Sequence, residues 1–197
     1  LVNQQGEIAI LILFPLILVF IVFIPYIVQL LYSSKFFPIN DMIIWSAYAM
    51  FFRAGSWAMS FQFLAKQSSK LFFINELIFN LIMLVSNVLG YRYFGLTGLG
   101  YSFLITYIIY FVQVYLLTKH YCNYSIHSNF LKTLILAIVV GGVCLGISLS
   151  SSKIIKYSVG SLLFIGASIF SVYQLNHKTG ILSKIKWRNK NISTYRH

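Results

Sequence analysis

The chain has 197 residues, and its composition excludes a soluble globular domain. Hydrophobic residues make up 59% of it and charged residues only 9%, whereas a soluble domain usually carries about 25% charged residues. The mean hydropathy is +0.82. With only three acidic residues, a water-facing surface could not be built around a core of this size. The composition therefore predicts a protein that is solvated largely by lipid.

The formal net charge of +12 is distributed like the flanks of membrane spans. Six of the 15 basic residues lie in the stretch 174–197, and most of the others lie in short gaps between apolar runs. A protein that binds nucleic acid would gather such residues in one groove or on one face. The distribution therefore predicts membrane lipids as partners and no nucleic acid.

Six apolar runs predict an all-α, polytopic membrane protein with six transmembrane helices in up-and-down order. About 20 helical residues cross the roughly 30 Å hydrocarbon core of a bilayer, and each run is within or at the edge of that range. The first run contains Pro15 and Pro25, which a membrane helix tolerates when its neighbours satisfy the freed carbonyls. The expected spans are 8–31, 42–64, 71–89, 99–117, 130–149 and 157–173.

The same runs divide the chain into a six-helix membrane region, 1–173, and a basic tail, 174–197. The positive-inside rule places the tail, and with it both ends of the chain, in the cytoplasm. Because the chain begins with Leu1 rather than Met, we expect a fragment of a longer protein that lacks its N-terminal part. The basic residues on the predicted cytoplasmic side are Lys66, Lys70, Lys119, Lys132 and the six of the tail, against Lys35, Arg92, Lys153 and Lys156 outside.

Arg53 is the most informative polar residue within the predicted spans. An arginine near the middle of a membrane helix costs about 2.5–3.5 kcal/mol on insertion scales, so it should face a partner or a wet cavity. Ser56 and Ser60 follow at helical spacing and share its face. Counting depth at 1.5 Å per residue places Arg53 closer to the level of Asn80 than to that of Glu76. We therefore expect Asn80 and water to hold Arg53.

Two further polar stripes follow, one in each of the next two predicted helices, and the three stripes together predict a hydrated cavity. Interhelical hydrogen bonding within a packed bundle is the alternative interpretation. Glu76 is the candidate for ion coupling. The stripes contain Glu76, Asn80 and Asn87, and then Ser102, Thr106, Tyr110 and Gln113. The candidate substrate-binding residues are Arg53, Asn80, Asn87, Ser56, Ser60, Thr106 and Gln113.

Catalytic and metal-binding patterns are absent from the sequence. There is no acid pair, no nucleophile with a matching His and acid, and no Cys/His metal spacing. We therefore expect no enzyme, no cofactor and no metal, although an intramembrane transferase using Arg53 and Glu76 stays open as an alternative. Gly95, Gly98 and Gly100 do not follow a strand, so they predict a tight interhelical turn and a close-packed helix start rather than a phosphate loop.

Three short motifs in a fixed order resemble bacterial polysaccharide and O-antigen flippases of the multidrug/oligosaccharidyl-lipid/polysaccharide exporter superfamily. Residues 25–38 contain a P-x-x-x-x-L-L-Y-x-x-x-F element. The second motif is FLAK at 63–66, followed by Lys70, and the third is FGLTGLG at 94–100. The resemblance covers more than half of the chain, and the last two predicted helices match in hydropathy alone.

The resemblance implies a flippase of the bacterial cytoplasmic (inner) membrane for surface polysaccharide biosynthesis. Such proteins have 12 or 14 helices in two lobes and carry an undecaprenyl-pyrophosphate-linked oligosaccharide across the membrane by alternating access. This chain looks like their last six helices, and Arg53 fits a cationic cavity that accepts the pyrophosphate. A cation-coupled drug exporter of the same superfamily is one alternative. An intramembrane polysaccharide polymerase or ligase is another, but such an enzyme usually carries a large polar outer loop, and the longest predicted one here is 32–41.

Overall fold

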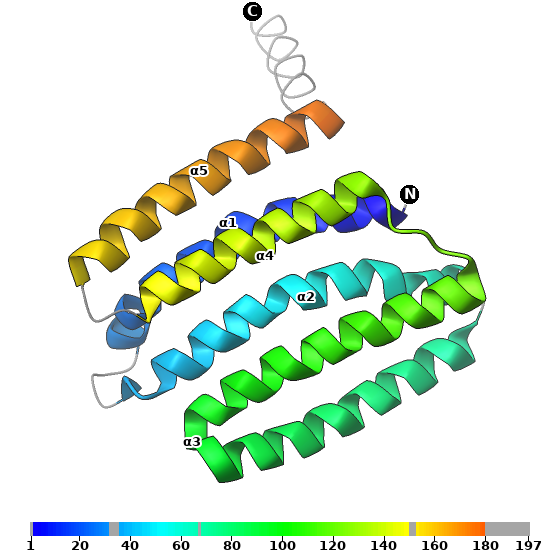
Figure 1. Cartoon of the computed structure of the whole chain (residues 1–197), viewed down its shortest axis with the longest axis horizontal. Helices are drawn as coiled ribbons and strands as arrows, with labels where there is room; N and C mark the ends of the chain where they lie inside the picture. The colour runs from blue at the N-terminus through cyan, green and yellow to red at the C-terminus, as the bar shows by residue number, and fades with distance from the viewer. Residues whose placement is uncertain (1, 32–35, 67, 150–152, 180–197) are drawn as a thin grey trace, which may run out of the picture.

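The fold is an all-helical bundle, as the apolar runs predict. The computed structural model describes residues 2–31, 36–66, 68–149 and 153–179, and no strand occurs among them. The helices run back and forth along one common direction (Figure 1). They are α1 (Val2–Leu31), α2 (Ile39–Ala65), α3 (Ser69–Cys122), α4 (Ser128–Ser148) and α5 (Lys153–Thr179).

Helix α3 reverses direction at a single residue, Gly95, and its two halves lie side by side (Figure 1). The backbone of Gly95 has φ 61° and ψ −141°, a conformation that residues with a Cβ rarely adopt. The sequence predicts a tight interhelical turn at Gly95, Gly98 and Gly100, and Gly95 confirms it. The turn is shorter than the predicted gap between the spans 71–89 and 99–117, because helical structure continues on both sides of Gly95 and this one glycine reverses the chain.

The glycines beside this bend allow two backbones to touch, which confirms the prediction of a close-packed helix start. A Cβ placed on Gly98 would lie 1.9 Å from the carbonyl oxygen of Gly90. A Cβ on Gly100 would lie 2.9 Å from the carbonyl oxygen of Met42 in α2. Neither oxygen can move away without displacing a helix, so both positions require glycine.

We expect Gly98→Ala to destabilise the protein by about 1–3 kcal/mol, the usual cost of forcing extra volume into a packed site. Gly146→Ala is the matched control, because a Cβ there meets nothing within 4 Å. Alanine also favours a helix over glycine by roughly 0.5–1 kcal/mol, so the control should be neutral or slightly stabilising. The measurement is thermal unfolding of both purified variants in detergent, and equal Tm values would contradict the close approach.

Helix α2 is the central element of the bundle. It packs against α3 on one side and against α1 and α4 on the other, and α5 covers α1 and α4 (Figure 1). Phe51 of α2 meets Phe14 of α1 with ring centroids 6.1 Å apart. On its other side, α2 contacts a second core in which the tilted rings of Phe79 and Tyr110 of α3 have centroids 4.3 Å apart. The two cores hold α2 in place from both sides.

The helices identify a multi-pass membrane protein. Among the described residues, four helical stretches are long and apolar enough to cross a bilayer: Val2–Leu31, Ser69–Cys122, Ser128–Ser148 and Lys156–Lys178. Large apolar side chains also cover the outer surface, as Leu84 (62% exposed) and Ile169 (67% exposed) illustrate. Helix α2, which contains the predicted span 42–64, is not among the four.

The two ends of the described chain meet at one end of the bundle. Lys178 in the last turn of α5 forms an ion pair with Glu7 in the second turn of α1. Helix α5 extends to Thr179, so residues 174–179 of the predicted tail continue the last helix. The rest of that tail, 180–197, lies outside the described residues.

Candidate functional site

Arg53 lies in the middle of α2, half-buried, where α3 fixes its guanidinium. Its Nη1 donates a hydrogen bond to the hydroxyl of Tyr107 at 3.3 Å. The guanidinium carbon also lies 5.2 Å from the ring centroid of Tyr107 and 5.8 Å from that of Phe79. At such distances an arginine is attracted by the negative face of each ring. Two aromatic residues of α3, Tyr107 and Phe79, therefore position the Arg53 guanidinium.

The expected partner of Arg53, Asn80, is elsewhere, so this prediction is wrong. Asn80 is exposed, and its Nδ2 donates to the backbone carbonyl of Glu76, one turn earlier, at 2.7 Å. Counting depth places Asn80 at the right level but does not give its direction around the helix axis. Successive helical residues point about 100° apart, and Phe79 rather than Asn80 faces α2.

A cavity of about 650 Å³ lies between α1 and α2, with Arg53 in its wall. Arg53 is the one charged residue among those that line it, and Ser46 is a polar neighbour. The rest of the wall is apolar, and its members include Leu16, Ile17 and Phe20 of α1 and Ala47, Met50 and Trp57 of α2. The cavity therefore combines a long apolar wall with a single positive charge.

The Arg53 guanidinium keeps most of its hydrogen-bonding capacity for a ligand. A guanidinium has five N–H donors in a planar fork. Within the described part of the chain, the bond to Tyr107 is the one hydrogen bond that this side chain makes. The planar fork matches the geometry of carboxylate and phosphate oxygens. Four of the five donors therefore have no hydrogen-bond partner in the described part of the chain.

Polar residues of the second and third predicted stripes connect the two halves of α3 to each other. The Tyr110 hydroxyl donates to the Glu76 carboxylate. Ser102 donates to the side-chain oxygen of Asn87. Gln113 Nε2 donates to Asn75 Oδ1 at 2.8 Å. Here the structure follows the alternative interpretation, interhelical hydrogen bonding.

The two serines on the Arg53 face form hydrogen bonds within their own helix. Ser56 and Ser60 are buried and donate to the backbone carbonyls of Arg53 and Trp57, at 2.9 and 3.0 Å. Thr106 is buried, and its hydroxyl has no hydrogen-bond partner among the described residues. Of the seven predicted substrate-binding residues, Arg53 alone lines the cavity between α1 and α2. The other six residues are therefore not part of the wall of this cavity.

A buried ion pair near the chain ends is the main polar feature that the sequence did not predict. Lys178 Nζ lies 2.6 Å from Glu7 Oε2, with 19% and 8% of the two side chains exposed. Thr133 of α4 donates to the other Glu7 oxygen at 3.1 Å, so three helices meet at this carboxylate. Because α3 doubles back, the chain crosses the bundle an even number of times, and the first turns of α1 and the last turn of α5 lie at the same end. Glu7 at the start of the chain and the basic residues at its end could therefore have suggested an ion pair from the sequence.

No metal centre is formed by the described residues, in which no group of three or more His, Cys, Asp or Glu side chains is placed to hold an ion. Cys122 and Cys144 are both free. Fold and site together define a multi-pass helical membrane protein with one cationic group in an apolar cavity. No family model matches the chain, and neither a curated protein nor a solved structure matches it.

Proposed function

We propose that the chain is the C-terminal lobe of a two-lobed flippase that moves an undecaprenyl-pyrophosphate-linked oligosaccharide across the bacterial cytoplasmic membrane. The observation that carries the proposal is the position of Arg53, a single cation in the wall of a 650 Å³ apolar cavity. A ligand with a long apolar chain and an anionic head is complementary to both parts of that wall. The three flippase-like motifs of the sequence support the same substrate class.

Six crossings of the membrane are part of the proposal. The two halves of α3 count as separate crossings because the chain turns back at Gly95, and α2 is the sixth, shielded by its neighbours. Arg53 lies 12 residues before Ala65, the last residue of α2, or about 18 Å along the axis. That depth is near the bilayer centre, where a fixed positive charge would attract a pyrophosphate that has left the headgroup region.

In the proposed cycle, Arg53 binds and orients the pyrophosphate, and the apolar walls of α1 and α2 accept the first prenyl units. Guanidinium–phosphate contacts use two parallel hydrogen bonds and are stronger than neutral ones. The Tyr107 hydroxyl holds one guanidinium nitrogen on the α3 side, and the other donors are available to the pyrophosphate while the lobes exchange access from one side of the membrane to the other. Glu76 stays the candidate for ion coupling, with Tyr110 as its partner.

Trp57 offers a direct binding test because it lies in the cavity wall. With Trp45 and Trp187 replaced by phenylalanine, its fluorescence reports on the cavity alone. We expect undecaprenyl pyrophosphate to change this signal at concentrations at least about tenfold lower than uncharged undecaprenol, because a hydrogen bond to a charged group contributes about 1.5–3 kcal/mol. Ala47→Leu should weaken both ligands by filling the cavity.

Two results would contradict this binding mode. Equal affinity for undecaprenol and undecaprenyl pyrophosphate would show that Arg53 does not contribute to binding of the pyrophosphate group. Preference for an apolar cation over the pyrophosphate would favour the drug-exporter alternative.

The orientation can be tested with single cysteines at exposed positions. In a variant with Cys122→Ser and Cys144→Ala, a membrane-impermeant maleimide added from outside should label Arg92→Cys and spare Lys70→Cys. Both positions are exposed, and they lie at opposite ends of the first half of α3. The positive-inside rule predicts this sidedness, and the reverse labelling pattern would overturn it.

A further inference from the structure

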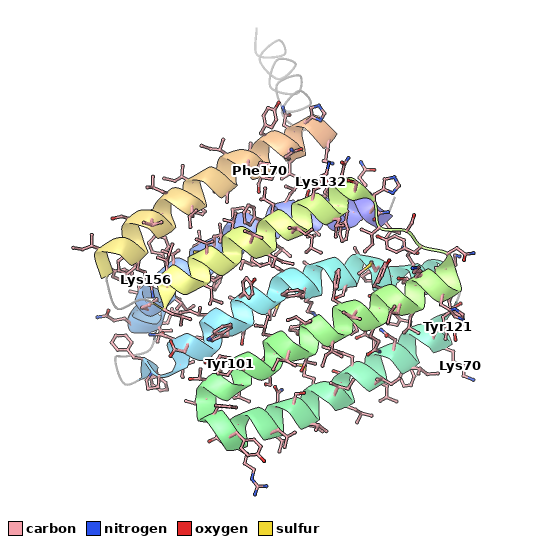
Figure 2. The ribbon with its side chains drawn as sticks, in the orientation of Figure 1. Lys70, Tyr101, Tyr121, Lys132, Lys156 and Phe170 are labelled. Atoms are coloured by element: carbon pink, nitrogen blue, oxygen red, sulfur yellow. The ribbon has the colours of Figure 1, made fainter. Side chains whose placement is uncertain are left out.

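A second hollow, lined by charged residues, lies between α4 and α5 at the end of the bundle where Glu7 and Lys178 pair. Its volume is about 310 Å³, and its wall includes Lys132, Gln174, His177 and the paired Glu7 and Lys178. Figure 2 shows Lys132 on α4 and Phe170 on α5 in neighbouring positions, and Lys156 toward the opposite end of the bundle. The hollow is separate from the cavity that contains Arg53.

The charge of this hollow cannot be neutralised by acidic side chains of the chain itself. The whole sequence has three acids, Glu7, Asp41 and Glu76. Glu7 is already paired with Lys178. Asp41 is in the first turn of α2, and Glu76 accepts the hydroxyl of Tyr110 in α3. Lys132 is therefore left with no carboxylate to pair with in the described structure, and its charge calls for an anion from outside.

The polarity of the hollow changes with depth along the two helices. Lys132 is near the start of α4, and Lys178 is near the end of α5. Leu136 lies one turn deeper in α4, about 6 Å from the level of Lys132, and Phe170 lies about 12 Å deeper than Lys178. The wall thus has two lysines and one glutamate at this end of the bundle, and it becomes apolar farther along the two helices. A free phosphate would contact only the charged end of the hollow, whereas a phospholipid would contact the charged end with its phosphate and the apolar part with an acyl chain.

We propose that this hollow is a binding site for one anionic phospholipid. The lipid phosphate contacts the ammonium of Lys132 and the donors of Gln174 and His177, and the start of an acyl chain lies against Leu136 and Phe170. Basic hollows between membrane helices at the headgroup level bind anionic lipid heads in this way. The inference does not depend on which molecule the Arg53 cavity takes.

Native mass spectrometry of the intact protein in detergent, titrated with phosphatidylglycerol, tests the site. The test variant is Lys132→Gln, which leaves the Glu7–Lys178 pair intact and changes an exposed side chain. We expect it to weaken binding of the first phosphatidylglycerol about fivefold, equivalent to about 1 kcal/mol for one basic residue. Lys70→Gln is the matched control, because Lys70 is an exposed lysine at the same end of the bundle but outside the hollow (Figure 2). It should change the affinity less than twofold.

Two further arms separate the lipid from other ligands. Phe170→Gln should weaken phosphatidylglycerol as well, because it removes the apolar wall, and phosphatidylcholine should bind at least about fivefold more weakly than phosphatidylglycerol. Millimolar inorganic phosphate should not displace the lipid. Equal losses in Lys132→Gln and Lys70→Gln, equal binding of the two lipids, or displacement by phosphate would each overturn the proposal.

Discussion

Replacing Arg53 with alanine should reduce transport of the lipid-linked oligosaccharide at least about tenfold, because hydrogen bonds to charged groups contribute about 1.5–3 kcal/mol each. The change removes the one charged group in the wall of the 650 Å³ cavity. Arg53→Lys should be intermediate, since lysine keeps the charge but loses the planar fork that binds two phosphate oxygens at once. The measurement is surface polysaccharide formation at matched membrane levels of each variant.

Arg92→Ala is the control for this prediction, because it removes an exposed arginine near the bend of α3, away from the cavity. It should transport normally. Thermal unfolding of Arg53→Ala should accompany the assay, since the guanidinium also packs on Tyr107 and Phe79. Normal transport by a folded Arg53→Ala protein would show that transport does not depend on this charge. Full activity of Arg53→Lys would show that the charge of Arg53, and not its planar fork, is what transport requires.

Glu7→Gln should have the largest effect on stability. It leaves the ammonium of Lys178 without its carboxylate at a position where 19% of the lysine side chain is exposed. Breaking a buried ion pair costs about 3–5 kcal/mol, and partial exposure places this pair at the lower end of that range, at about 3 kcal/mol. The measurement is thermal unfolding of the purified protein in detergent, with a clear fall in Tm as the expected result.

Glu76→Gln is the matched control, since it makes the same chemical change in a glutamate that accepts a hydrogen bond from Tyr110. A glutamine oxygen still accepts that bond, so the cost should stay below about 1.5 kcal/mol. The double variant Glu7→Gln/Lys178→Gln should recover part of the lost stability, because it leaves no unpaired charge. Similar losses from Glu7→Gln and Glu76→Gln would contradict the importance of the pair.

Hydropathy and glycine positions were enough to predict most of the helical architecture. Apolar runs of membrane-spanning length place helices, and Gly95 marks the bend because few other residues adopt its backbone angles. Helix ends were less accurate. Helix α5 continues to Thr179 because polar and basic residues also form helix, and Lys178 gains a partner by doing so.

The candidate site was predicted only in part, because composition and spacing do not fix how a helix is rotated against its neighbours. Arg53 was identified by the cost of burying its charge, and it does line a cavity. Its partner was missed, since Asn80 and Phe79 differ in depth by one residue but in direction by about 100°. Tyr107 gave no signal either, because a tyrosine in an apolar run looks like any other aromatic residue. The Glu7–Lys178 pair joins the two ends of the chain, and local patterns do not reveal such contacts.

The most direct test of the proposed function is the sidedness of the lipid-linked oligosaccharide in cells that lack the intact protein. An impermeant enzyme or lectin added to spheroplasts detects the glycan on the outer leaflet, and membranes opened by lysis expose the total. The proposal predicts that the oligosaccharide accumulates on the cytoplasmic leaflet and that the wild-type gene, but not Arg53→Ala, restores it to the outer leaflet. Unchanged sidedness in the deleted strain would contradict the flippase function.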